Sequence, residues 1–274
     1  MNVLDSKVMK GFVRMITDGW ELNFHERNGG NASYRMKPEE VEEINDSLDF
    51  SKPWVEIGET ATNLANEFFI VTGSGKYFRN VQLDPADTCC IIEIDASGSR
   101  YRVVWGLVNG GKPTSELPAH ILNHSVKCEA TGGTHRVLYH GHPANVIALT
   151  FVLPLNDEVF TRELWEMITE CPMIFPEGVG VLEWMVPGSD HIAQATSEKM
   201  KKYDVVIWAH HGMFASGVDF DSTIGLFHLV EKSAEVLVKV ISMGGKKQTT
   251  SIQNLKDLDA DLGLNIENRF LFEK

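Results

Sequence analysis

Two histidines that stand one residue apart could bind a metal ion at the end of a predicted strand. His140 and His142 close an apolar run in the stretch VLYHGHPAN, residues 137–145. Residues i and i+2 of a strand point to the same face, so both imidazoles can reach one cation at about 2.0–2.1 Å. A lone HxH is weak evidence, however, because polar residues also occupy strand ends.

A second apolar run offers the third ligand that a catalytic zinc site requires. The stretch DVVIWAHHGMFASG, residues 204–217, is strand-like as far as two histidines and a glycine. Two strand ends that both carry histidine favour a metal site over a chance pairing. The alternation of side chains leaves open whether His210 or His211 is the ligand.

Another histidine pair competes for the same role. His120 and His124 are four residues apart on a predicted helix, and Glu116 stands four residues before His120. This spacing could bind a metal, but we interpret the pair as one half-buried helix face. The histidines that stand alone are not expected to be ligands: His25, His135, His191 and His228.

The stretch KPTSELPAH, residues 112–120, permits two interpretations of its glutamate. Thr114 or Ser115 could cap a helix whose first turn tolerates Pro118 and favours Glu116. Alternatively, the Glu116 carboxylate lies beside the metal and moves a proton. The segment alone does not separate these interpretations.

Two glycine turns could hold an anion. TGSGK, residues 72–76, is not a nucleotide P-loop, because Ile70 stands where that motif needs its first glycine and Tyr77 follows the lysine. Its amide groups could still form an anion nest. ERNGGNAS, residues 26–33, could do the same, although Asn-Gly commonly marks a hairpin. Two such turns with a metal site suggest a phosphorylated substrate.

The elements that must position these groups predict an α/β domain with a mainly antiparallel sheet covered by helices. Strands occur in pairs, including a hairpin in DTCCIIEIDASGSRYRVVWGL, and no regular βαβ alternation is present. Helices are expected over 3–22, 115–130, 158–170, 188–202 and 221–242, the last ended by MGG.

Composition limits the partners. The 274 residues carry a formal net charge of −13 and only short basic clusters, which argues against nucleic acid and anionic membranes. No apolar run is long enough to span a bilayer, and the first twenty residues lack a signal-peptide pattern, so we expect a cytoplasmic protein. The four cysteines, none in a CxxC pair, are expected to be reduced core thiols.

Eight short motifs, in this order, closely resemble the zinc-dependent class II aldolase/adducin-head family. They are RNGGN, IVTGSGKYFRNVQLDP, PTSELPAH, HGH, LWE…TEC, VPG, HHG and EKSAEVLVKVISMGG, and the resemblance runs from about residue 10 to about residue 250. It implies a single domain over 1–274 with a three-layer α/β/α fold around a mainly antiparallel sheet. It also implies a cyclic homotetramer.

The resemblance also implies roles for individual residues. The ligands of one Zn²⁺ per subunit are His140, His142 and His211, the last being the histidine directly before glycine. Glu116 matches the catalytic carboxylate, and Glu170 matches a second, auxiliary acid near a subunit boundary. The positions that match the substrate and phosphate site are Asn28, Gly30, Asn31, Ser74, Gly75, Thr114 and Ser115.

The implied reaction is the reversible aldol cleavage of a phosphorylated ketose. A sibling branch that acts on fuculose phosphate carries its carboxylate in the glycine turn, where this chain has Ser74-Gly75-Lys76 and no acid. Three alternatives stay open: a pentulose-phosphate 4-epimerase of the same family, a zinc hydrolase, and a non-enzymatic interaction module like the adducin head. The last would be expected to lack the three histidines.

Overall fold

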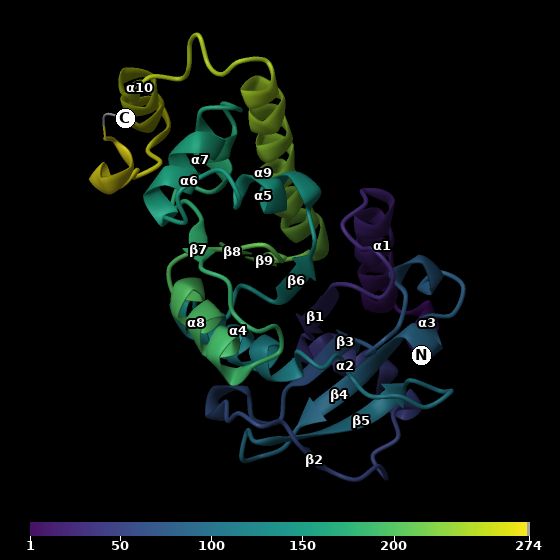
Figure 1. Cartoon of the computed structure of the whole chain (residues 1–274). Helices are drawn as coiled ribbons and strands as arrows, with labels where there is room; N and C mark the ends of the chain where they lie inside the picture. The colour runs from purple at the N-terminus through teal and green to yellow at the C-terminus, as the bar shows by residue number, and fades with distance from the viewer. Residues whose placement is uncertain (273–274) are drawn as a thin grey trace.

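A nine-stranded sheet runs through the structure, a computed structural model that describes residues 1–272 (Figure 1). The strand order is β2-β5-β4-β3-β1-β6-β9-β8-β7, and every neighbouring pair is antiparallel except β7 with β8. The mainly antiparallel sheet is therefore confirmed. The strands are β1 (Asn31–Arg35), β2 (Val55–Glu56), β3 (Phe68–Thr72), β4 (Cys89–Ile94), β5 (Arg100–Gly106), β6 (Val137–Gly141), β7 (Gly180–Leu182), β8 (Val205–Trp208) and β9 (Gly212–Gly217).

Helices cover both faces of the central strands (Figure 1). On one side α1, α5, α6 and α7 pack around the long helix α9, and on the other side α4 packs against α8. The helices are α1 (Lys7–Glu21), α2 (Pro38–Ile44), α3 (Pro85–Thr88), α4 (Leu117–Ala130), α5 (Ala144–Leu149), α6 (Asp157–Trp165), α7 (Cys171–Ile174), α8 (Asp190–Met200), α9 (Phe220–Ser242) and α10 (Ile252–Leu262).

Alternation along β1 shows how the two helix layers are separated. The ring of Tyr34 packs against Phe220 of α9, with ring centroids 4.7 Å apart. The neighbouring side chain, Ser33, points the other way and hydrogen-bonds His120 and His124 of α4. Since successive strand residues face opposite sides of a sheet, α9 and α4 lie on opposite faces. The expected α/β/α layering is therefore present.

Several elements differ from those expected. The predicted hairpin is β4 with β5, but the helix expected over 158–170 ends at Trp165 of α6, and a separate short helix, α7, begins only at Cys171. Pro172 lies in the first turn of α7, where a missing N–H costs nothing, whereas inside one long helix it would break a hydrogen bond. The structure also contains helices that the sequence patterns do not predict: α2, α10 and short helical turns between β3 and β4. The Asn-Gly pair leads from a turn into β1 and forms no hairpin.

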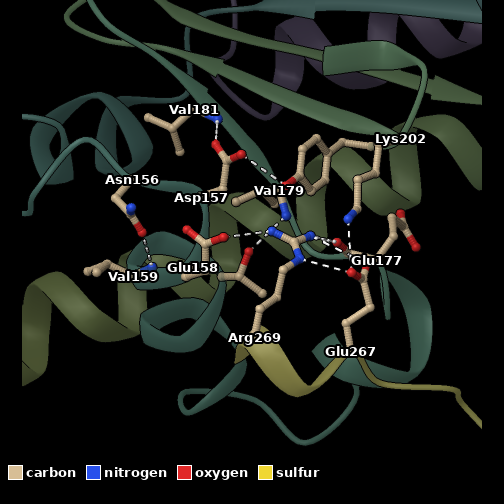
Figure 2. A network of polar contacts seen from close by, with 12 residues as sticks. Asn156, Asp157, Glu158, Val159, Glu177, Val179, Val181, Lys202, Glu267 and Arg269 are labelled. Carbon is tan, nitrogen blue, oxygen red and sulfur yellow. Dashed lines mark hydrogen bonds and ion pairs between the residues drawn. The ribbon is translucent and has the colours of Figure 1, made fainter. Parts of the chain in front are cut away.

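A polar network ties the C-terminal segment to α6 and to the chain before β7 (Figure 2). Arg269 donates from Nη1 to Glu158 at 3.0 Å and from Nε to Glu267 at 3.0 Å. Its Nη2 reaches the carbonyl oxygen of Glu177 at 3.5 Å. Asp157 accepts the backbone N–H of Val181 at 2.7 Å, which joins α6 to β7.

Two expectations from composition concern the core and the membrane. All four cysteines are free, and Cys89, Cys90 and Cys171 are buried, as expected for core thiols. Within residues 1–272, none of the helices combines the length and apolar content that crossing a lipid bilayer requires.

Candidate metal centre

Three histidines from two regions of the chain converge at one end of the central strands. His140 lies in β6, His142 follows its last residue, and His211 lies in the turn between β8 and β9. One ring nitrogen of each lies within 4.8 Å of the others. The Nε2 atoms of His140 and His142 and the Nδ1 atom of His211 are buried without a hydrogen-bond partner. These residues therefore fit a divalent metal ion, which would satisfy such nitrogens.

The pairing of β6 with β9 brings the ligands together. Gly141 pairs with Met213 across the two strands, so His142 comes directly after this pair on β6 and His211 lies two residues before it on the β9 side. A Cβ atom at Gly212 would overlap the carbonyl oxygen of Gly141 and lie 2.9 Å from Cδ2 of His142. The glycine after His211 thus permits the close approach of the two ligand-bearing segments.

The structure groups His211, and not His210, with the other two histidines. His210 is exposed and has a left-handed backbone, with φ of 61°. Its Nδ1 lies 3.1 Å from Oγ1 of Thr150, and its ring packs on Phe151 with centroids 4.1 Å apart. The side chain is occupied away from the cluster.

Neighbouring groups set the orientation and charge of the ligand rings. Nδ1 of His140 donates to the carbonyl oxygen of Met213 at 3.1 Å, which leaves Nε2 as the free lone pair. Nδ1 of His142 donates to Oε1 of Glu26 at 2.7 Å. Burial holds the pKa of His140 well below its usual range and lowers that of His211 to about 4. Neutral imidazoles are the form that binds a metal.

Glu116 places a carboxylate beside the three histidines. Its Oε2 lies 4.0 Å from Nε2 of His140 and accepts a hydrogen bond from Nδ2 of Asn31 at 2.9 Å. Burial raises the pKa of Glu116 above its usual range. Helix α4 begins at Leu117, one residue later than Glu116, and the Glu116 side chain makes no capping bond to it. The backbone N–H of Glu116 itself donates to Oγ1 of Thr114 at 3.3 Å.

The second histidine pair is not a half-buried face, and that interpretation was wrong. His120 and His124 are 0% and 1% exposed, and the Ser33 hydroxyl lies 2.6 and 2.8 Å from their ring nitrogens. Burial lowers the pKa of His120 to about 3. Helix periodicity could not reveal this, because the polar partner lies on β1, far away in the sequence.

The two turns expected to hold phosphate lie against different parts of the fold. The glycine turn after β3 lies beside the segment before α4: Ser74 N–H donates to Lys112 at 2.8 Å and Thr114 N–H to Thr72 at 2.8 Å. Ser74, Gly75 and Ser115 are exposed there. Lys76 is paired with Asp87 at 2.7 Å.

The turn before β1 is held against β6 by a buried histidine, His25, for which the sequence alone predicts no role in the site. Nδ1 of His25 donates to the carbonyl oxygen of Gly29 at 3.0 Å, and its Nε2 accepts from Tyr139. Gly30 has φ of 78°, and Asn28 is exposed in the same turn. Burial lowers the pKa of His25 to about 3.

Glu170 is separate from this group within residues 1–272. It is exposed and precedes α7, where its carbonyl oxygen accepts the N–H groups of Met173 and Ile174 at 3.0 Å each. No described hydrogen bond or ion pair links its carboxylate to the histidine cluster.

The fold and the site belong to a known class of proteins. The chain is a member of the family described as class II aldolase and adducin N-terminal domain, whose profile matches residues 12–238. A rhamnulose-1-phosphate aldolase of Mannheimia succiniciproducens is 49% identical over 263 residues, covering 96% of this chain and 97% of that protein. The rhamnulose-1-phosphate aldolase of Escherichia coli K12 is 48% identical, with 96% of each chain covered.

Solved structures support the same architecture. A sugar-phosphate aldolase from Thermotoga maritima superposes with a TM-score of 0.73 at 26% identity, covering 88% of this chain and 97% of that one. An L-fuculose 1-phosphate aldolase superposes with a TM-score of 0.60 at 16% identity, covering 94% and 97%. The second likeness concerns the fold alone.

Proposed function

We propose that this chain is a zinc-dependent aldolase that reversibly cleaves L-rhamnulose 1-phosphate to dihydroxyacetone phosphate and L-lactaldehyde. The substrate follows from relatives that are 48–49% identical over nearly the whole chain and are named rhamnulose-1-phosphate aldolases. The observation that carries the chemistry is the carboxylate of Glu116 beside three convergent histidine nitrogens, 4.0 Å from Nε2 of His140.

The proposed reaction moves a proton at the carbon next to a carbonyl group. His140, His142 and His211 would hold a divalent metal, which would supply a Lewis acid for this carbonyl and make the neighbouring proton more acidic. Glu116 takes that proton in the direction of aldol synthesis and returns it in the direction of cleavage. A carboxylate whose pKa is raised by burial is a stronger base than an exposed one, which suits this role.

The phosphate group would be held by the two turns that border the site. Ser74 and Gly75 lie next to Thr114 and Ser115 through the backbone hydrogen bonds around Thr72. The exposed hydroxyl groups of Ser74 and Ser115 and the amide of Gly75 would suit a phosphate dianion. We assign the other turn, with Asn28 and Gly30, to the same group. Binding the remote phosphate would fix the reacting carbon near Glu116.

Four further assignments belong to this proposal. Zinc is the ion that suits three neutral imidazoles with one open position. Glu170 is an auxiliary acid that acts in an assembled cyclic homotetramer. The 274 residues form a single catalytic domain, and the protein acts in the cytoplasm.

The direct test combines metal analysis with an assay. Purified protein is expected to contain one zinc per chain and to release dihydroxyacetone phosphate from L-rhamnulose 1-phosphate, followed by a coupled dehydrogenase. Other ketose 1-phosphates should react more slowly. Interconversion of pentulose phosphates without release of dihydroxyacetone phosphate would instead identify an epimerase. Metal binding with no reaction on any phosphorylated ketose would overturn the proposal.

A further inference from the structure

A chain of hydrogen bonds runs from Glu116 into the buried layer between β1 and α4. Nδ2 of Asn31 donates to Oε2 of Glu116 at 2.9 Å, and Oδ1 of Asn31 lies 2.5 Å from Nε2 of His120. Nδ1 of His120 lies 2.6 Å from the Ser33 hydroxyl, which in turn lies 2.8 Å from Nε2 of His124. Secondary structure sets this alignment: two strand residues two apart face two helix residues four apart.

The position of each proton in this chain follows from its Glu116 end. An ionised carboxylate only accepts hydrogen bonds, so Asn31 must present its NH₂ group to Glu116 and its oxygen to His120. An amide oxygen only accepts, so Nε2 of His120 carries the proton. A neutral imidazole has one N–H, so Nδ1 of His120 accepts from Ser33, whose oxygen accepts from His124.

An asparagine amide has two orientations of nearly the same shape. If Asn31 were flipped, its oxygen would face Oε2 of Glu116 and its NH₂ group would face the N–H of His120. Both contacts would be repulsive as long as the Ser33 hydroxyl donates to Nδ1 of His120 and keeps the proton on Nε2. The N–H of His120 thus favours the orientation that gives Glu116 a donor.

We propose that His120 is a positioning residue for the aldol reaction, which holds the amide of Asn31 so that its N–H bonds stay on Glu116. The inference rests on the proposed function, since it concerns the carboxylate that moves the proton. The described side-chain hydrogen bonds of His120 are to Asn31 and Ser33, and none links it to the three histidines of the candidate metal centre. It acts through Asn31, which aims one carboxylate oxygen at the site.

A matched pair of substitutions separates this role from packing. In His120→Gln the amide nitrogen can take the place of Nε2 and still donate to Asn31. In His120→Asn the shorter side chain reaches only the position of Nδ1, so the donor is lost. Both replace one buried polar ring by a smaller amide, so both lose packing. His124→Asn serves as a control, because it removes a bond to Ser33 without touching Asn31.

The measurements separate proton transfer from binding. Deuterium uptake at the hydroxymethyl carbon of dihydroxyacetone phosphate in D₂O reports proton transfer without the aldehyde. His120→Asn is expected to lower this rate and kcat by about 10- to 100-fold. This is the typical effect of removing a hydrogen bond that orients a functional side chain. KM, zinc content and the unfolding midpoint should match those of His120→Gln. His120→Gln and His124→Asn should keep rates within about threefold of the parent protein.

Each other outcome has a defined meaning. Equal losses in His120→Asn and His120→Gln, or rates that follow the unfolding midpoint, would overturn the positioning role. If His120→Asn does not fold, Ser33→Ala is the replacement variant. It removes the hydroxyl that keeps the His120 proton on Nε2. It should slow exchange more than His124→Asn does, and an equal rate would contradict the inference. A parent protein that releases no dihydroxyacetone phosphate refutes the proposed function instead.

Discussion

Oε2 of Glu116 lies 4.0 Å from Nε2 of His140, and the same oxygen accepts the Asn31 amide. One carboxylate oxygen therefore faces the candidate metal ligands on one side and a fixed donor on the other. This arrangement leaves Oε1 without a described partner among residues 1–272. The candidate metal ligands and the proposed base are therefore different side chains, so each can be removed without the other.

Glu116→Gln should abolish catalysis and keep the metal. The amide has the shape of the carboxylate but cannot take a proton, and general-base contributions are typically 10²- to 10⁴-fold. We expect kcat to fall by at least about 100-fold while zinc content, measured by plasma mass spectrometry, stays near that of the parent. A variant with near-normal turnover would remove Glu116 from its role.

His211→Ala should release the metal, whereas the adjacent His210→Ala should retain it. Of these two histidines, only His211 belongs to the cluster with His140 and His142. The ring of His210 is hydrogen-bonded to Thr150 instead. Loss of one of three ligands lowers affinity by orders of magnitude, so dialysed His211→Ala should contain little zinc. The opposite result for the two variants would exchange the ligand assignment.

Glu26→Gln should weaken metal binding without removing it. Its carboxylate accepts the N–H of His142 at 2.7 Å, but the Glu26 side chain is 67% exposed, so water can partly replace it. We expect zinc affinity to fall by about tenfold in a competition titration with a chromophoric chelator. Glu21→Gln, at an exposed position at the end of α1, is the control and should bind zinc like the parent.

Glu177→Gln should raise stability by an amount that grows as pH rises above about 4.5. Burial raises the pKa of Glu177 to about 7, with a contribution from the charge of Asp204, and its Oε1 has no hydrogen-bond partner. Between about pH 4.5 and 7 the folded chain keeps this proton while the unfolded chain releases it. The group's contribution to the free energy of unfolding therefore falls as pH rises through this window.

The measurement for Glu177 is urea unfolding at two pH values. The glutamine variant should gain on the order of 1–3 kcal/mol over the parent at pH 8 and little at pH 4.5. Glu21→Gln should shift neither value, because that side chain is exposed. A gain of equal size at both pH values would show that packing, and not ionisation, is responsible.

Local sequence patterns predict many of the helices and strands correctly, and the elements that they miss have physical causes. The Ser-Gly turn between two apolar runs predicts the β4–β5 hairpin correctly. By contrast, β9 begins directly after His211 and consists of GMFASG, whose small residues give little alternation. Its strand character comes from pairing with β6 and β8 on both sides. Short runs of this kind depend on tertiary contacts more than on intrinsic preference.

The sequence likewise indicates some residues of the candidate site and not others. The spacing of His140 and His142, with the two histidines after the apolar run that forms β8, indicates a metal site from sequence but leaves His210 and His211 as alternatives. The partners of those residues do not follow from spacing, because they come from distant segments. Asn31 and His120 are 89 residues apart, and Glu26 and His142 are 116 apart. Only the packing of β1 against α4, and of the α1–β1 turn against β6, reveals them.

The ligand-bearing segments border strands in the interior of the sheet, and this has a consequence for the ion itself. His140 is stacked on Phe214 at 4.5 Å with ring planes 14° apart, and its Nδ1 is bound to the backbone of β9. Since contacts within the protein fix the orientation of this ring, a chelator should remove the ion without unfolding the protein. The emptied protein should then accept cobalt in place of zinc, and the visible absorption of tetrahedral cobalt would make the exchange directly observable.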